Sequence, residues 1–133
     1  MAQTYLAFFL VGLGGAAGSM LRYAVKLLTP AFEAQSSFPY ATLLVNAVGS
    51  FSIGLLAAVF STGMLSGGDD PWHRHRLLLM TGLLGGFTTF SSFALEIDEL
   101  LRVQRPIAAA GYIVVSNLLC IGLATIGYRL MRS

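Results

Sequence analysis

Long hydrophobic stretches without charged residues alternate with short polar segments along this chain. The four stretches cover residues 1–21, 34–68, 77–95 and 106–128. A helix that rises about 1.5 Å per residue needs roughly 20 residues to cross a hydrocarbon core of about 30 Å, and each stretch provides about that number. The pattern therefore predicts an all-α membrane protein with four transmembrane helices in a single domain, residues 1–133.

Proline, glycine and polar residues between the stretches indicate where the helices end. We expect helices over about residues 4–23, 40–60, 75–101 and 106–129. Pro30 and Pro39 mark the first connection, residues 66–71 form a turn-rich second one, and Pro106 suits the first turn of the fourth helix. A secretory signal would have Lys or Arg before its hydrophobic stretch, and the first stretch has neither. We therefore expect it to be retained as a membrane helix.

The third stretch contains a segment that is unusual for a plain membrane span, Gly85-Gly86-Phe87-Thr88-Thr89-Phe90-Ser91-Ser92-Phe93. Adjacent glycines weaken a helix interior, and Ser and Thr side chains compete for backbone hydrogen bonds. Backbone that leaves the helix at membrane depth must be buried in protein or line a wet cavity. We therefore expect the third helix to be broken around residues 85–89 and the break to mark an ion or substrate site.

The composition agrees with a membrane protein and disfavours other classes. Apolar residues make up 56% of the chain and charged residues only 11%, against about 25% charged residues in soluble domains. The formal net charge of +2 comes from dispersed residues, so we expect no nucleic-acid partner. Cys120 is the single cysteine, which excludes an intramolecular disulfide and a C-x-x-C metal site.

Positive charges are divided evenly between the two sides of the predicted membrane protein. The amino terminus, the second connection and the carboxyl terminus share one side of a four-span topology. That side has Arg74, Arg76, Arg129 and Arg132, and the opposite side has Arg22, Lys26, Arg102 and Arg105. Because each side has the same number of positive residues, the positive-inside rule selects no orientation. The chain either adopts one orientation because some terminal arginines count less, or inserts both ways and pairs as an antiparallel dual-topology homodimer.

Neutral polar side chains form stripes within the predicted membrane helices. Polar residues recur at every fourth position in the second helix, at Thr42, Asn46 and Ser50, and in the fourth helix, at Tyr112, Ser116 and Cys120, so each set lies on one helix face. The third helix adds the polar residues Thr88, Thr89, Ser91 and Ser92, next to Phe90 and Phe93. Single Ser or Thr residues often serve only as helix contacts, as do the glycines of Gly14-x-x-x-Gly18 and Gly82-x-x-x-Gly86. An amide in hydrocarbon needs partners, so the stripes together favour a polar track. The polar side chains of this track include many hydrogen-bond donors and no fixed negative charge, so the track suits an anion better than a cation.

Two other functional classes stay open on these residues. A small dual-topology, proton-coupled multidrug transporter would need a carboxylate early in the chain, but the first and second helices contain no Asp or Glu, and neither does the fourth. A non-conducting assembly subunit would rely on glycine-mediated helix packing alone. Ion flux through the purified protein would separate both classes from a channel.

Three motifs in order give the chain a resemblance to a known family. They are Gly15-Ala16-Ala17-Gly18 leading to Arg22-Tyr23, Thr42-Leu43-Leu44-Val45-Asn46 with Gly49-Ser50-Phe51, and the segment from Gly85 to Phe93. Together they resemble the Fluc/CrcB fluoride channels over nearly the whole chain. The resemblance implies an antiparallel dual-topology homodimer in the bacterial inner membrane, with two anion pores and a central sodium ion. It also implies passive export of cytoplasmic fluoride, which lowers its toxicity, and no catalysis.

The resemblance also implies roles for particular residues. The backbone carbonyls of Gly85 and Thr88 would bind the sodium ion. The anion pore would be lined by Asn46, Phe90, Phe93, Ser91, Ser92, Tyr112, Ser116, Thr42 and Arg22. Arg22 either attracts anions to a vestibule or extends to the membrane interface, since its position permits both. Ser92 keeps the hydroxyl of the threonine that many members have there, whereas Cys120 stands where a small hydroxyl is common. A solvated helix end fits Glu96 better than a role at the pore mouth.

Overall fold

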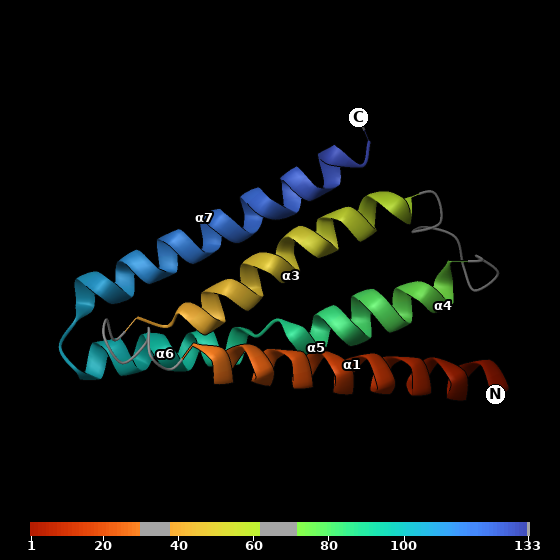
Figure 1. Cartoon of the computed structure of the whole chain (residues 1–133), viewed down its shortest axis with the longest axis horizontal. Coiled ribbons are helices and arrows are strands. Elements are labelled where there is room, and N and C mark those ends of the chain that lie inside the picture. Colours follow the sequence, from red (N-terminus) through yellow and green to blue (C-terminus); the bar gives the residue numbers. More distant parts are fainter. Residues whose placement is uncertain (30–37, 62–71, 133) are drawn as a thin grey trace.

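The computed structural model describes residues 1–29, 38–61 and 72–132, and every regular element in these ranges is a helix. The elements are α1 (Ala2–Leu28), α3 (Tyr40–Val59), α4 (His73–Arg76), η2 (Leu77–Leu84), α5 (Gly85–Phe87), α6 (Phe90–Arg102) and α7 (Pro106–Leu130), and η2 is a π-helix. Figure 1 shows that α4, η2, α5 and α6 follow one another along a single line. The residues predicted to form the two turn-rich connections, apart from Pro39, lie outside the described ranges.

Four helical segments are long and apolar enough to cross a membrane: Ala2–Leu28, Tyr40–Val59, His73–Arg102 and Pro106–Leu130. The four predicted spans are therefore confirmed, and the chain is a multi-pass membrane protein. The bounds of the last three agree with the predicted ones to within two residues, which is the usual scatter at helix ends. The first helix is longer than predicted, because the chain stays helical beyond residue 23 and the long side chain of Lys26 can reach the polar boundary.

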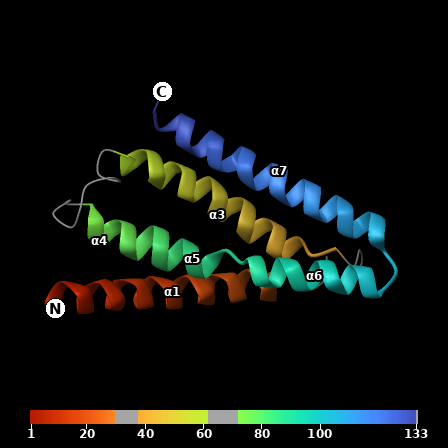
Figure 2. The same ribbon diagram turned by 180° about the vertical axis from the view of Figure 1, so that it is seen from behind.

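The four segments alternate in direction and pack as two pairs. α1 packs mainly along η2 and α5, while α3 packs along α7. Figures 1 and 2 show the two pairs side by side, with both chain termini at the same end of the bundle. α6 continues the line of the third segment and contacts α7, so it joins the two pairs. This arrangement places the middle of the third segment between α1 on one side and α3 on the other.

Close backbone contact holds α1 against the third segment. A Cβ atom added to Gly18 would lie 2.0 Å from the Leu83 carbonyl oxygen, and one added to Gly86 would lie 2.4 Å from the Gly15 carbonyl oxygen. Any side chain at either position would push the helices apart. The interpretation of Gly14-x-x-x-Gly18 and Gly82-x-x-x-Gly86 as helix contacts is thus confirmed, since these glycines face each other across one interface.

The interior of a single chain is small. Phe93, Leu100, Ala109 and Tyr112 form its buried apolar cluster, where α6 meets α7. Many large apolar side chains are exposed instead, including Phe8 at 74% and Leu118 at 68%. Such an outside surface suits hydrocarbon or a neighbouring protein surface rather than water.

The third segment changes backbone conformation near its middle. α5 ends at Phe87, Thr88 is extended with φ −79° and ψ 159°, Thr89 is extended with φ −152° and ψ 124°, and α6 begins at Phe90. The non-helical stretch is shorter than the predicted residues 85–89, because Gly85 is helical with φ −62° and ψ −37°. Gly86 serves the close contact with α1, and the two threonines provide the extended backbone.

Candidate functional site

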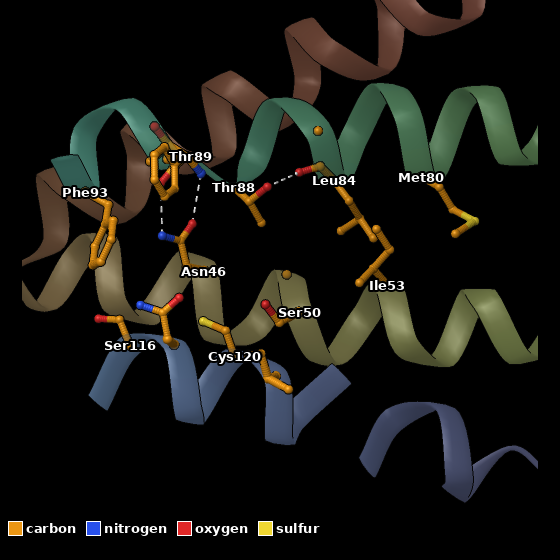
Figure 3. Close-up of a pocket in the computed structure, with 15 residues that line it drawn as sticks. Asn46, Ser50, Ile53, Met80, Leu84, Thr88, Thr89, Phe93, Ser116 and Cys120 are labelled. Atoms are coloured by element: carbon orange, nitrogen blue, oxygen red, sulfur yellow. Dashed lines mark hydrogen bonds between the residues drawn. The ribbon is translucent and has the colours of Figure 1, made fainter. Parts of the chain in front are cut away.

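Asn46 of α3 holds the extended residue Thr89 by both of its backbone groups. The Asn46 side-chain amide donates to the Thr89 carbonyl at 3.0 Å, and the Thr89 N–H donates to Asn46 Oδ1 at 2.8 Å. Figure 3 shows this pair of hydrogen bonds bridging α3 and the third segment. The membrane amide whose partners the sequence left unknown is therefore satisfied by main chain, as a polar group away from water must be.

The same contacts take hydrogen-bond donors away from two carbonyls. In an α-helix the Gly85 carbonyl would accept from the N–H of Thr89, four residues later, but that N–H donates to Asn46. The Thr88 carbonyl would accept from Ser92, whose N–H donates at 3.2 Å to Thr89 Oγ1, the cap of α6. Both carbonyls thus lack the donors that they would have in a helix. A neutral carbonyl oxygen without such a donor is a suitable ligand for a hard cation. The described residues contain no cluster of three or more His, Cys, Asp or Glu that could hold a metal ion instead.

A cavity of about 350 Å³ lies between α3, the third segment and α7. Its polar lining comes from Asn46, Ser50, Thr88, Thr89, Ser116, Asn117 and Cys120, and Gly85, Phe90 and Phe93 line it as well. Ser116 is only 5% exposed, and its Oγ has no hydrogen-bond partner among the described residues. A hydroxyl in that position needs a polar partner to offset its burial.

A second cavity, of about 300 Å³, lies on the other side of Thr89. Ser19, Arg22 and Lys26 of α1 line it together with Thr42, Thr89 and Ser92. Thr89 therefore belongs to both cavities. The second cavity differs from the first in having two cationic side chains, so it is the more favourable of the two for attracting an anion.

Glu96 has surroundings that the sequence interpretation missed. The prediction of a solvated helix end is wrong, because the Glu96 carboxylate accepts from Thr42 Oγ1 at 2.5 Å and from the Tyr112 hydroxyl at 2.8 Å. These contacts connect α3, α6 and α7, and the side chain of Glu96 is partly buried. One signal was available, because Glu96 lies three residues after Phe93 and so shares its helix face.

The two predicted pore phenylalanines have different surroundings. Their ring centroids are 5.7 Å apart, and the Phe93 ring also lies 5.0 Å from that of Tyr112. Phe93 is 7% exposed and belongs to the core, whereas Phe90 is 78% exposed. The two rings therefore contact each other, but only Phe93 is held in place by its own chain.

The predicted pore residues fall into two groups with two outliers. Asn46, Phe90, Phe93 and Ser116 line the first cavity, and Thr42, Ser92 and Arg22 line the second. Ser91 is exposed, and its hydroxyl lies 3.2 Å from Thr89 Oγ1. Tyr112 is fully buried and lines neither cavity, and its hydroxyl is linked to the rest of the site by its hydrogen bond to Glu96. Gly85 and Thr88, the predicted sodium ligands, both line the first cavity.

These features define a small multi-pass membrane protein with polar cavities between its helices. The chain belongs to the family described as CrcB-like protein, Camphor Resistance (CrcB), whose model matches residues 9–128. The predicted resemblance to the Fluc/CrcB family is thereby confirmed.

Several curated relatives cover almost the full chain. The fluoride-specific ion channel FluC of Thermus thermophilus is 45% identical over 123 residues, which are 92% of this chain and 93% of the relative. The protein of the same name from Erythrobacter litoralis is 43% identical over 125 residues, 92% of this chain and 89% of the relative. That of Rhizobium meliloti is 44% identical over 124 residues, 93% of this chain and 94% of the relative. These names describe channels and not enzymes, in agreement with the expectation of no catalysis.

Proposed function

We propose that this chain forms a fluoride channel through which cytoplasmic fluoride leaves the cell passively, so that fluoride toxicity falls. The observation that carries the proposal is the buried Ser116 hydroxyl, which has no partner among the described residues, in a cavity lined by neutral donors and in a chain with fluoride-channel relatives. Neutral donors replace part of the hydration shell of a small anion without holding it as tightly as a fixed positive charge. We also propose that the protein lies in a bacterial inner membrane, since the relatives that it resembles are channels of bacteria.

The proposed anion path runs from the cationic second cavity, past Thr89, into the first. Arg22 and Lys26 raise the local concentration of anions at its entrance. Beyond Thr89, the ion meets the hydroxyl of Ser116 and the edges of the Phe90 and Phe93 rings, which carry the positive part of the ring quadrupole. Glu96 holds the hydroxyls of Thr42 and Tyr112 in fixed positions beside this path.

We further propose that two copies pair as an antiparallel dual-topology homodimer. Phe90 lines the first cavity and is nevertheless 78% exposed, so a second subunit is needed to close the wall beside it. The even division of positive residues between the two ends supports insertion in both orientations. Each of the two pores would then be bounded by both subunits.

A sodium ion at the dimer axis fits the backbone of the third segment. The carbonyls of Gly85 and Thr88 lose their helical donors to Asn46 and Thr89, and the same two carbonyls from the partner would complete a set of four. A cation held there would link the subunits and add positive potential near the pores. If so, protein purified in N-methylglucamine buffer should gain thermal stability on sodium titration and not on N-methylglucamine addition; equal curves would contradict the sodium site.

Fluoride efflux from liposomes tests the function directly. Vesicles loaded with potassium fluoride and containing the purified protein should release fluoride to an external electrode once valinomycin balances the charge. Vesicles loaded with chloride serve as the selectivity control. Release no faster than from protein-free vesicles would contradict the channel. The predicted alternative, a proton-coupled multidrug transporter, would instead require a pH gradient, and the relatives give it no support.

A further inference from the structure

The single cysteine of the chain lines the same cavity as the unpaired Ser116 hydroxyl. Cys120 follows Ser116 by four residues on α7, so both side chains lie on one helix face. Both line the cavity of about 350 Å³, and Cys120 is a free, partly buried thiol. Figure 3 shows its side chain pointing from α7 towards α3, where Ser50 and Asn46 lie.

The buried Ser116 hydroxyl beside this cavity needs a polar partner. A hydroxyl that is 95% buried and has no partner among the described residues costs free energy unless water or an ion supplies one. A group attached one helical turn away, at Cys120, would fill part of the cavity that Ser116 also lines. The thiol is therefore placed where its modification has a functional consequence.

We propose that the Cys120 thiol binds a soft, thiophilic metal cation, for which methylmercury serves as the probe. The bound metal blocks the cavity and stops ion flux through it, a consequence that rests on the proposed channel function. Sulfur ligands favour soft metals, and binding displaces the thiol proton. In the reaction with methylmercury chloride, the S–H bond breaks, an S–Hg bond forms, chloride leaves and the proton passes to water. Mercury stays divalent, so no oxidant is required. The cavity is roughly ten times the volume of about 30 Å³ that one water takes up in the liquid, which leaves room for the adduct.

The test combines mass spectrometry with fluoride efflux on the reconstituted full-length protein. Wild type should gain one methylmercury adduct, and its fluoride flux should fall at least ten-fold. Excess dithiothreitol should remove the adduct and restore the flux. C120S should gain no adduct, and its fluoride flux should be the same with and without the reagent. The matched control is L118C in the C120S background, because Leu118 is 68% exposed and lies on the other side of α7. This variant should be labelled without loss of its own flux.

Three results would overturn the proposal. They are an adduct on Cys120 with unchanged flux, a thiol that reacts only after denaturation in detergent, and equal inhibition of C120S. An absence of fluoride flux in untreated wild-type vesicles would contradict the proposed function instead. The adduct measurement would then still decide whether the folded protein offers the thiol to a soft metal.

Discussion

Asn46 and Thr89, which are 43 residues apart in the sequence, exchange two hydrogen bonds across the helix interface. This exchange fixes the extended backbone against α3 and removes the helical donor of the Gly85 carbonyl. The geometry of both the proposed anion path and the proposed cation site thus depends on one amide side chain. Its removal is the most direct test of the site.

Asn46→Ala should weaken both the fold and the flux. Each buried backbone group of Thr89 that loses its partner costs about 1–3 kcal/mol, so the free energy of unfolding should fall by about 2 kcal/mol or more. Fluoride flux should fall at least ten-fold. Thermal unfolding in detergent and liposome efflux measure the two effects. Ser52→Ala on the same helix removes only an exposed bond to the Val48 carbonyl and serves as the control; if both variants behave alike, the Asn46 contact is unimportant.

Glu96→Gln tests the carboxylate between Thr42 and Tyr112. The glutamine nitrogen cannot accept, so one of the two hydroxyls loses its acceptor, and a buried donor left without a partner costs about 1–3 kcal/mol. We expect a lower unfolding temperature together with reduced flux. Asp98→Asn removes an exposed ion pair to Arg102 on the same helix, which is worth about 0.3–0.5 kcal/mol. Indistinguishable melting curves and fluxes for the two variants would argue against a role for Glu96.

Gly18→Ala and Gly12→Ala form a matched pair on α1. The new Cβ at position 18 would meet the Leu83 carbonyl oxygen at 2.0 Å, whereas at position 12 it would meet nothing within 4 Å. Overpacking costs about 1–3 kcal/mol, so Gly18→Ala should destabilise the protein. Gly12→Ala should stabilise it by up to about 1 kcal/mol, because alanine is the better helix former. Unfolding measurements that show the same change for both would contradict the close helix contact.

Phe90→Ile and Phe93→Ile should both lower flux strongly while the proposed dimer persists in size-exclusion chromatography. Only Phe93→Ile should also destabilise the subunit, by about 1–3 kcal/mol, because the Phe93 ring packs in the core against Tyr112. Phe90 is exposed on its own chain, and its replacement should change that chain's stability by less than about 0.5 kcal/mol. Wild-type flux in both variants would refute the aromatic wall of the path.

The sequence alone predicted the four spans, because hydrophobic length is a local property that needs no knowledge of neighbouring helices. It also predicted the glycine contacts and the polar stripes, since residues four apart share a helix face wherever the helix lies. A family motif identified Asn46 and the polar stripe of the fourth helix identified Ser116, and the structure places both on one cavity. These inferences depend on composition and spacing within single helices.

Tertiary structure decided which of these residues meet. Thr89 lies 43 residues from Asn46, and Thr42 lies 54 residues from Glu96, so no spacing within one helix reveals such pairs. It also left Gly85 and Gly86 helical and made Thr88 and Thr89 extended, although all four belong to one helix-weakening segment. The physical reason is that a hydrogen bond depends on the relative position of two helices, which is set by how their surfaces pack and not by the propensities of either one.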